Sequence, residues 1–450
     1  MSEIEYPSIG TGAIALTPNA VRNFGFRSNQ YTWLRNMNPN ELVMNGTRGG
    51  TEFISLDIPD DFFAVRVGFM NTTASTFDVT LVKAIASAGT DYVQPVDSTG
   101  AARADADWST LTSVNAGLDV PEIVTVAGAS TAHTVLANAT NASTGLTDDI
   151  AYTWTDWVAC KSQPALPITG MRRLMIRALI PSSQTVVYNI QTNDDWWANS
   201  ALNYGYDQWR GGVRNNTDYV TTPSSASAQT TSTLETAPVT GMMCAVIQVL
   251  TKRPAVIGMS CGDSTYANPA WGMSVLAAVQ AGQATVGTVP QGFVSCAVGG
   301  TYNAQFFPRL AALLPLVRPS WVVLPGWTTN DFNVAGLSYA ASEATFNARL
   351  ARVAALAREN GAVPIFTTPW GYDTASTIPS MLAMWQSMRA RALTMANGGE
   401  LVADQFQEVG NVLTARYYDG MSSDGLHPTK PANQRGARVL MPQIKRVTGL

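Results

Sequence analysis

Between about residues 51 and 250, apolar and polar positions alternate in short runs divided by Gly, Asn, Asp, Ser and Thr. A period of two, filled by β-branched and aromatic side chains, predicts strands with one buried face. Many such strands with no amphipathic helix between them are typical of an antiparallel, jelly-roll-like sandwich. The predicted strands are 51–58, 62–71, 77–85, 122–128, 150–160, 173–180, 185–192 and 242–250.

After residue 250 the hydrophobic period changes. Short apolar runs alternate with longer segments in which Ala, Leu and Val recur at helical spacing. This alternation predicts a parallel sheet with helices on both faces. The predicted strands are 255–261, 292–298, 321–324, 363–367 and 401–404, and the predicted helices are 270–281, 304–317, 341–360, 379–397 and a last one from about 431.

The change of period divides the chain into two domains, as its 450 residues exceed the usual size of a single core. We expect an all-β accessory domain in residues 1–250 and an α/β domain in residues 251–450. Turn-rich residues 1–50 are interpreted as an irregular arm. The Ser/Thr-rich stretch 220–241 has the composition of a linker. The strand predicted after it moves the boundary to about 251–253.

The net charge of −4 conceals an asymmetry between the two parts. Residues 1–250 carry 13 Lys/Arg and 22 Asp/Glu, a balance of −9, and residues 251–450 carry 15 and 10, a balance of +5. The parts therefore attract each other, or the basic part attracts an anionic substrate, and docking of the parts is the simpler interpretation. No basic patch with interleaved aromatic residues is present, which argues against nucleic-acid binding.

The four cysteines show neither CxxC nor Cys/His metal spacing, so we expect small core residues and no metal site. The first residues lack the basic and apolar segments of a signal peptide, and no apolar run approaches the ~20 residues of a membrane span. We expect a soluble protein without a membrane partner. Cytoplasmic, extracellular and virion-associated locations remain open, as does the oligomeric state.

Aromatic residues gather in the first part, where Tyr152, Trp154 and Trp157 nearly alternate. They predict either a sugar-stacking platform or a sandwich core, and the core is favoured because large aromatics bury well. His133 has no partner in the pattern and is expected at the surface or in a turn.

The first predicted strand of the second part ends in Gly262-Asp263-Ser264-Thr265. Catalytic groups gather at the carboxyl ends of strands in open α/β sheets, so the Ser264 hydroxyl is a candidate nucleophile. The alternative is an Asp-Ser helix cap. Only one histidine, His427, lies in this part. Asp424, three residues upstream, can accept a hydrogen bond from its imidazole and orient it as a base.

Two later strand ends offer donors for an oxyanion. Gly300 lies in the turn after the second strand, where a backbone N–H can approach a substrate closely. Asn330 follows the third strand, and its side-chain amide is a suitable donor. Separately, each of these is an ordinary loop residue.

Ser, Gly, Asn and His at successive strand ends resemble the blocks of the SGNH (GDSL-type) hydrolase superfamily. The resemblance covers residues 251–450, and its blocks are similar to 262–265, the Gly300 turn, 328–331 and 424–427. Two positions depart from the pattern. Thr265 stands where the first block commonly has Leu, and Thr328 stands where the third block usually has Gly.

The resemblance implies a flavodoxin-like, three-layer α/β/α fold and a serine ester hydrolase that needs no metal or organic cofactor. It implies that Ser264 is the nucleophile, His427 the base and Asp424 the residue that orients His427. It also implies that the N–H groups of Ser264 and Gly300 and the Asn330 side chain hold the oxyanion.

Aromatic residues near the predicted strand ends either line a substrate pocket or simply pack. They are Tyr266, Trp271, Tyr302, Trp327 and Trp370. The leading hypothesis is an O-deacetylase acting on a small ester or an acetylated polysaccharide. A lipase, a thioesterase and a polyester hydrolase are alternatives within the same fold. A virion or carbohydrate-binding structural protein with an inactive hydrolase domain is an alternative outside enzymes.

Overall fold

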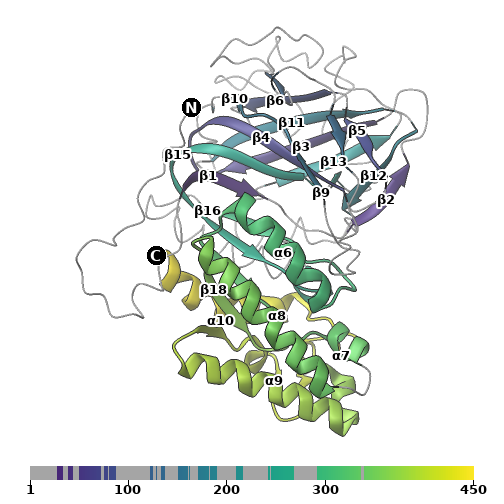
Figure 1. The fold of residues 1–450 in the computed structure, drawn as a ribbon, viewed down its shortest axis with the longest axis vertical. Coiled ribbons are helices and arrows are strands. Elements are labelled where there is room, and N and C mark those ends of the chain that lie inside the picture. Colours follow the sequence, from purple (N-terminus) through teal and green to yellow (C-terminus); the bar gives the residue numbers. More distant parts are fainter. Residues whose placement is uncertain are drawn as a thin grey trace.

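A five-stranded parallel sheet organises the second part of the chain (Figure 1). The strand order is β16-β15-β17-β18-β19, and every neighbouring pair is parallel. In chain order this is 2-1-3-4-5, the flavodoxin-like arrangement. The strands are β15 (Ala245–Ser260), β16 (Gln291–Ser295), β17 (Trp321–Leu324), β18 (Val363–Thr367) and β19 (Leu401–Ala403).

The computed structural model describes part of the chain, and every statement below concerns that part. It comprises residues 28–33, 39–43, 50–71, 75–79, 81–87, 122–124, 128, 133–136, 151–160, 162, 171–181, 183–189, 209–215, 242–243, 245–267, 291–335 and 339–449. The predicted helix 270–281 lies outside these residues, as does Trp271.

Helices follow the strands of this sheet as the hydrophobic period predicts. In Figure 1 α6 and α8 lie side by side in front of the sheet, and α10 lies behind it, against β18 and β19. The helices are α4 (Ser264–Ala267), α6 (Asn303–Val317), α7 (Thr329–Ala335), α8 (Tyr339–Glu359), α9 (Pro379–Asn397) and α10 (Lys430–Thr448), with 3-10 helices η2 (Asp373–Thr377) and η3 (Gln405–Glu408). A hairpin of β20 (Gly410–Asn411) and β21 (Arg416–Tyr417) precedes α10.

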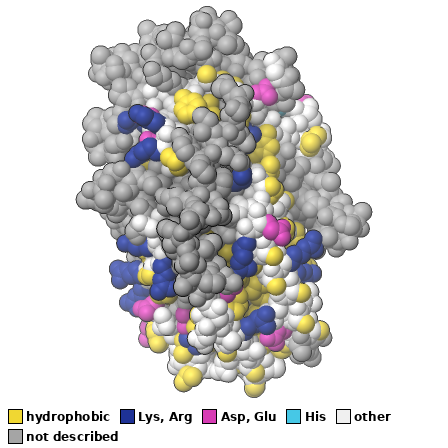
Figure 2. Space-filling view, turned by 60° about the vertical axis from the view of Figure 1, so that its left-hand side comes forward, with side chains coloured by type: hydrophobic (Ala, Val, Ile, Leu, Met, Phe, Trp, Pro, Cys, Tyr) yellow, Lys and Arg dark blue, Asp and Glu magenta, His cyan; other side chains and the backbone are white. Residues whose placement is uncertain are grey.

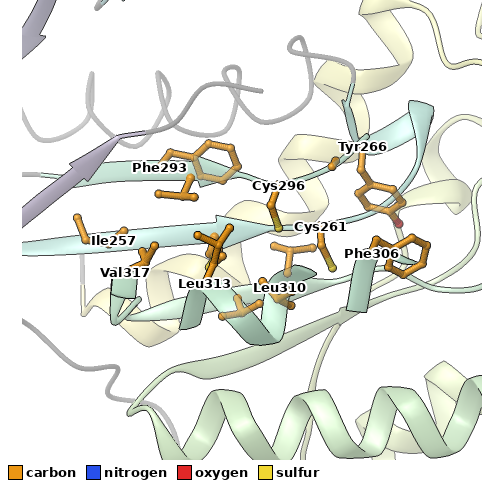
Figure 3. Packing of buried hydrophobic residues seen from close by; sticks show 14 of the residues in the cluster. Ile257, Cys261, Tyr266, Phe293, Cys296, Phe306, Leu310, Leu313 and Val317 are labelled. Carbon is orange, nitrogen blue, oxygen red and sulfur yellow. The ribbon is translucent and has the colours of Figure 1, made fainter. Parts of the chain in front are cut away.

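The apolar face of α6 shows why this layer forms. Its buried residues Phe306, Leu310, Leu313 and Val317 are spaced three or four apart, so they share one face of the helix. Figure 3 shows this face against the strands that carry Ile257, Phe293 and the two cysteines. Cys261 and Cys296 are fully buried and free, which confirms the prediction of small core residues.

Strands of the first part pair only in the antiparallel sense within the described residues. Five of them form the sheet β13-β3-β11-β6-β7. β1 and β4 pair with the first half of β15, and β9 and β10 pair with β4. The strands are β1 (Ser28–Trp33), β2 (Pro39–Val43), β3 (Gly50–Ile58), β4 (Phe62–Asn71), β5 (Phe77–Val79), β6 (Leu81–Ser87), β7 (Glu122–Val124), β8 (His133–Val135), β9 (Ala151–Trp154), β10 (Val158–Ala159), β11 (Arg172–Ile180), β12 (Thr185–Asn189), β13 (Trp209–Asn215) and β14 (Met242–Met243). A two-sheet sandwich for residues 1–250 stays a prediction.

Two expectations for the first part need correction. Residues 1–50 contain strands, because β1 pairs with β15 and β2 pairs with β12. His133 lies neither at the surface nor in a turn, since it is 1% exposed in β8 and stacks on Phe69 with ring centroids 6.5 Å apart. A lone histidine carries no local sign of burial, which depends on what the fold places around it.

The predicted strands 242–250 and 255–261 are largely one strand. β15 runs from Ala245 to Ser260, pairing first with β1 and β4 and then with β16 and β17. The middle of β15 contains Pro254, which predicts a break between two strands. The pairing partners of β15 change at this point, so the absence of an N–H on the proline is tolerated. The expected domain boundary near residue 251 therefore falls inside a continuous strand.

None of the described helices combines the length and the apolar character that crossing a membrane would require.

Candidate active site

A glycine turn delivers the candidate nucleophile at the end of β15. Gly262 has φ +144°, and a Cβ there would lie 2.6 Å from the Tyr266 ring, so a side chain would clash. Asp263 then caps α4, accepting the Thr265 backbone N–H at 2.9 Å. The helix-cap interpretation thus applies to Asp263. Ser264 is the first residue of α4, and its hydroxyl remains available for a different contact.

Ser264, His427 and Asp424 form one chain of hydrogen bonds. His427 Nε2 lies 2.9 Å from Ser264 Oγ, although the two residues are 163 positions apart in the sequence. The other ring nitrogen, Nδ1, lies 2.7 Å from Asp424 Oδ2. This arrangement can remove a proton from the serine hydroxyl while the carboxylate holds the imidazole in the required tautomer.

The environment of Asp424 favours its ionised form. Partial burial works in the other direction, but hydrogen bonds from the His427 ring and from the backbone N–H groups of His427 and Leu426 hold the pKa of the Asp424 carboxyl well below its usual range. Asp424 is therefore ionised wherever His427 can act as a base, and it can stabilise an imidazolium.

Residues that the sequence did not single out support the loop of Asp424 and His427. The Asp373 N–H donates to Gly425 O at 2.8 Å, and the Tyr417 N–H donates to the Asp373 carboxylate at 3.0 Å. The Tyr417 hydroxyl donates to Leu426 O at 3.1 Å, next to His427. These contacts join η2, the hairpin and the loop, and no local motif could have identified them.

The expected oxyanion donors lie at the start of α4, in the turn before α6 and at the start of α7. Gly300 is exposed with φ +75°, and neither its N–H nor that of Ser264 has an acceptor among the described residues. Asn330 Nδ2 donates to Thr301 O at 3.1 Å and to Asp263 Oδ2 at 3.3 Å. The contact with Asp263 is long for an N–H···O bond, and the two contacts tie the start of α7 to the segments that carry Ser264 and Gly300.

Two buried carboxylates hold these loops in place. Asp331 accepts the Thr328 and Asn303 backbone N–H groups, each at 2.9 Å, and so joins the start of α7 to the start of α6. Asp263 accepts from Thr265 and Asn330. Burial raises the pKa of Asp263 to about 6 and also raises the pKa of Asp331, although hydrogen bonds oppose both shifts.

Thr328, which replaces the usual glycine of the third block, fits its position without strain. It is not among the residues with positive φ, so the loop requires no glycine there. Its hydroxyl lies 3.0 Å from Asp331 Oδ2 and 3.4 Å from the Asp331 N–H, as in a capping box at the start of α7.

The aromatic residues expected to line a substrate pocket fall into two groups, those buried in packing and those that line a cavity. Tyr266 is buried, and its hydroxyl bonds Thr367 and Gln405 at 2.7 Å. Trp370 is buried against α10. Tyr302 and Trp327 both line a cavity beside the Asn330 loop.

Among the described residues, no group of three or more His, Cys, Asp or Glu side chains is placed to hold a metal ion.

Comparisons with known proteins give structural neighbours only. No protein-family model matches the chain, and no curated protein matches it. Its structural neighbours are GDSL-type hydrolases and esterases. A lipolytic G-D-S-L protein from Desulfitobacterium hafniense is 16% identical, with 42% of this chain and 99% of that chain covered and a TM-score of 0.34. TesA is 21% identical over 42% and 98% of the chains, with a TM-score of 0.33.

The acetylxylan esterase Axe2 from Geobacillus stearothermophilus is 17% identical over 42% of this chain and 94% of its own, with a TM-score of 0.34. Identities and TM-scores this low carry no argument about activity. We therefore rest the function on the geometry of the site.

Proposed function

We propose that the chain is a serine ester hydrolase whose reaction centre is Ser264. The observation that carries this proposal is the hydrogen-bond chain from Asp424 through His427 to Ser264, with distances of 2.7 and 2.9 Å. Nucleophile, base and orienting carboxylate are the three parts that serine acyl transfer requires.

In the proposed reaction, Ser264 Oγ attacks the ester carbonyl carbon while His427 Nε2 takes the hydroxyl proton. The N–H groups of Ser264 and Gly300 hold the carbonyl oxygen as it becomes negative. Asn330 joins them by turning one amide hydrogen from its long contact toward the oxyanion. The imidazolium gives its proton to the leaving alcohol, and a water deprotonated by His427 then hydrolyses the acyl-enzyme.

The proposed substrate is an acetyl ester on a carbohydrate. In support, the half-buried aromatic side chain of Tyr302 lines a cavity beside the start of α7, and such a surface suits a sugar ring. A lipase, a thioesterase and a polyester hydrolase are the enzyme alternatives, and they would prefer other acyl or alcohol parts. An inactive virion or carbohydrate-binding protein is the non-enzyme alternative.

Hydrolysis of 4-nitrophenyl acetate tests the proposal. We expect Ser264-dependent release of nitrophenol, with kcat lower by at least about 10³-fold in Ser264→Ala because no other hydroxyl contacts His427 Nε2 in the described chain. Ser387→Ala is the matched control, since Ser387 is exposed on α9.

Equal rates in wild type and Ser264→Ala would contradict the assignment of the nucleophile. No turnover of any ester by the wild type would favour the inactive structural protein. A preference for long-chain over acetyl nitrophenyl esters would exclude the deacetylase and favour a lipase.

A further inference from the structure

A cavity of about 190 Å³ lies beside the candidate site, between the start of α6 and the α7–α8 region. Its walls include residues one or two positions after the expected donors Gly300 and Asn330. Tyr302 lies two positions after Gly300, and Asp331 comes immediately after Asn330. A group bound in this cavity would therefore lie next to the segments that carry these donors.

Arg349 of α8 lines this cavity with its charge uncompensated by any contact. Its one hydrogen bond is from Nη1 to Asn303 Oδ1 at 2.5 Å, and no Asp or Glu pairs with it in the described part of the chain. A guanidinium has five N–H donors, so four of them have no acceptor among the described residues. Arginine in a partly enclosed site is well suited to bind a carboxylate with two parallel hydrogen bonds.

The nearby Asp331 carboxylate does not pair with Arg349, so the guanidinium remains available to a ligand. Its carboxylate is 2% exposed, and its two oxygens already accept from Asn303 and Thr328. Asn303 stands between Asp331 and Arg349, bonding each of them. The negative charge is thus enclosed by donors, while the positive charge lies at the cavity.

An aromatic side chain lies at the same cavity. Tyr302 is half-buried and lines the cavity together with Arg349. A free cation and an aromatic ring at one cavity indicate a ligand that is both anionic and ring-like.

The part of the chain that forms the cavity has the matching sign. Residues 251–450 carry 15 Lys/Arg against 10 Asp/Glu. Figure 2 shows Lys and Arg side chains spread over the lower half of one face of the molecule. Such a field raises the local concentration of anionic substrates.

We propose that Arg349 and the cavity around it bind a carboxylate group of the ester substrate, so that the enzyme selects an acidic substrate such as the acetyl ester of a uronic acid. This rests on the proposed ester hydrolase activity. The carboxylate can belong to the acyl part or to the alcohol part, and Arg349 is a specificity-determining residue in either case.

Two pairs of substrates distinguish a carboxylate on the acyl part from one on the alcohol part. The two members of each pair differ by one negative charge. For the acyl part, 4-nitrophenyl hemisuccinate is compared with 4-nitrophenyl butyrate. For the alcohol part, peracetylated methyl glucuronide is compared with its methyl ester, following release of acetate. We expect wild-type kcat/KM to favour the charged member of one pair, and Arg349→Gln to lower that ratio about tenfold or more, as loss of a charge-assisted contact predicts.

Arg352→Gln is the matched control, because Arg352 is exposed one turn away on α8 and does not line the cavity. A structural role of Arg349 would lower kcat/KM for both members of a pair equally, whereas the proposal requires the ratio to change. The inference is overturned if neither pair shows a charge preference, if Arg349→Gln keeps it, or if Arg352→Gln loses it equally. Absence of Ser264-dependent turnover on all four esters would instead remove the proposed function, and this inference with it.

Discussion

At the scale of single residues, the candidate site depends on neighbours with different tasks. Asp263 caps α4 and anchors Asn330, which leaves the adjacent Ser264 hydroxyl to contact His427. In the sequence, an Asp-Ser pair at a strand end is consistent with either a helix cap or a nucleophile. The structure gives one task to each residue.

The buried Asp263 carboxyl leads to a prediction about pH and stability. Burial raises its pKa from 3.8 to about 6, so the folded state holds the proton more tightly than the unfolded chain does. The contribution to the free energy of unfolding is complete below about pH 4 and is lost as pH rises through about 6. Asparagine does not titrate, so Asp263→Asn lacks this pH-dependent loss of stability. The free energy of unfolding relative to wild type should then increase from pH 4 to pH 7, by on the order of 2–3 kcal/mol.

Urea unfolding at both pH values measures this difference. The hydrogen bonds lost in Asp263→Asn change the free energy of unfolding by the same amount at both pH values. The exposed Asp419→Asn is the matched control for removing one carboxylate. A difference from wild type that stays constant between pH 4 and pH 7 would contradict the prediction.

At the scale of elements, β15 is the strand on which both parts of the molecule are built. Its second half lies between β16 and β17 and ends at the Gly262 turn. The size of the side chains at a contact sets how closely two neighbouring elements can pack. Gly258 of β15 packs directly on the Trp321 indole, where an added Cβ would lie 2.0 Å from the ring.

Gly258→Ala should therefore destabilise the protein. Trp321 is 1% exposed and has no room to move away, so we expect a loss of about 1–3 kcal/mol in the free energy of unfolding, measured from urea midpoints. Trp321→Phe removes the atoms that would clash. In that background the additional cost of Gly258→Ala should shrink, and an undiminished cost would show that the clash is not its cause.

At the scale of the whole molecule, the two parts of the chain are joined by more than a linker. β15 belongs to both, and the buried Gln248 links them further, accepting from Arg66 Nε at 2.6 Å and donating to Leu316 O at the end of α6 at 2.9 Å. Buried hydrophobic residues from both parts form one cluster, from Leu56 to Val447.

This continuity predicts cooperative unfolding. Scanning calorimetry of the full chain should show one transition, with a calorimetric enthalpy close to the van't Hoff enthalpy, because β15 cannot lose its β4 partner without exposing that shared core. Two separate transitions would instead show that residues 1–250 and 251–450 are independent domains, as the change in hydrophobic period alone predicts.

Much of the second part could be predicted from sequence. Strands 321–324 and 363–367 coincide with β17 and β18, and the helix expected at 304–317 differs from α6 by one residue. Such elements are short, wholly apolar or strongly periodic, so local pattern suffices. α7 was missed because it is short and begins in a loop motif.

The first part was harder to predict. β1 and β2 lie in a stretch full of turn residues, and they are strands because β15 and β12 pair with them. Strand formation depends on partners distant in the chain, which no local window contains.

Local features of the chain identify the groups that could do the chemistry: a serine at a strand end, one histidine and its upstream aspartate. Three further features follow only from the packed fold: Ser264 and His427 lie 2.9 Å apart, β15 crosses the expected boundary, and Arg349 reaches a cavity beside Asn330. Distances between residues far apart in a chain follow from the packing of whole elements, and local periodicity does not encode that packing.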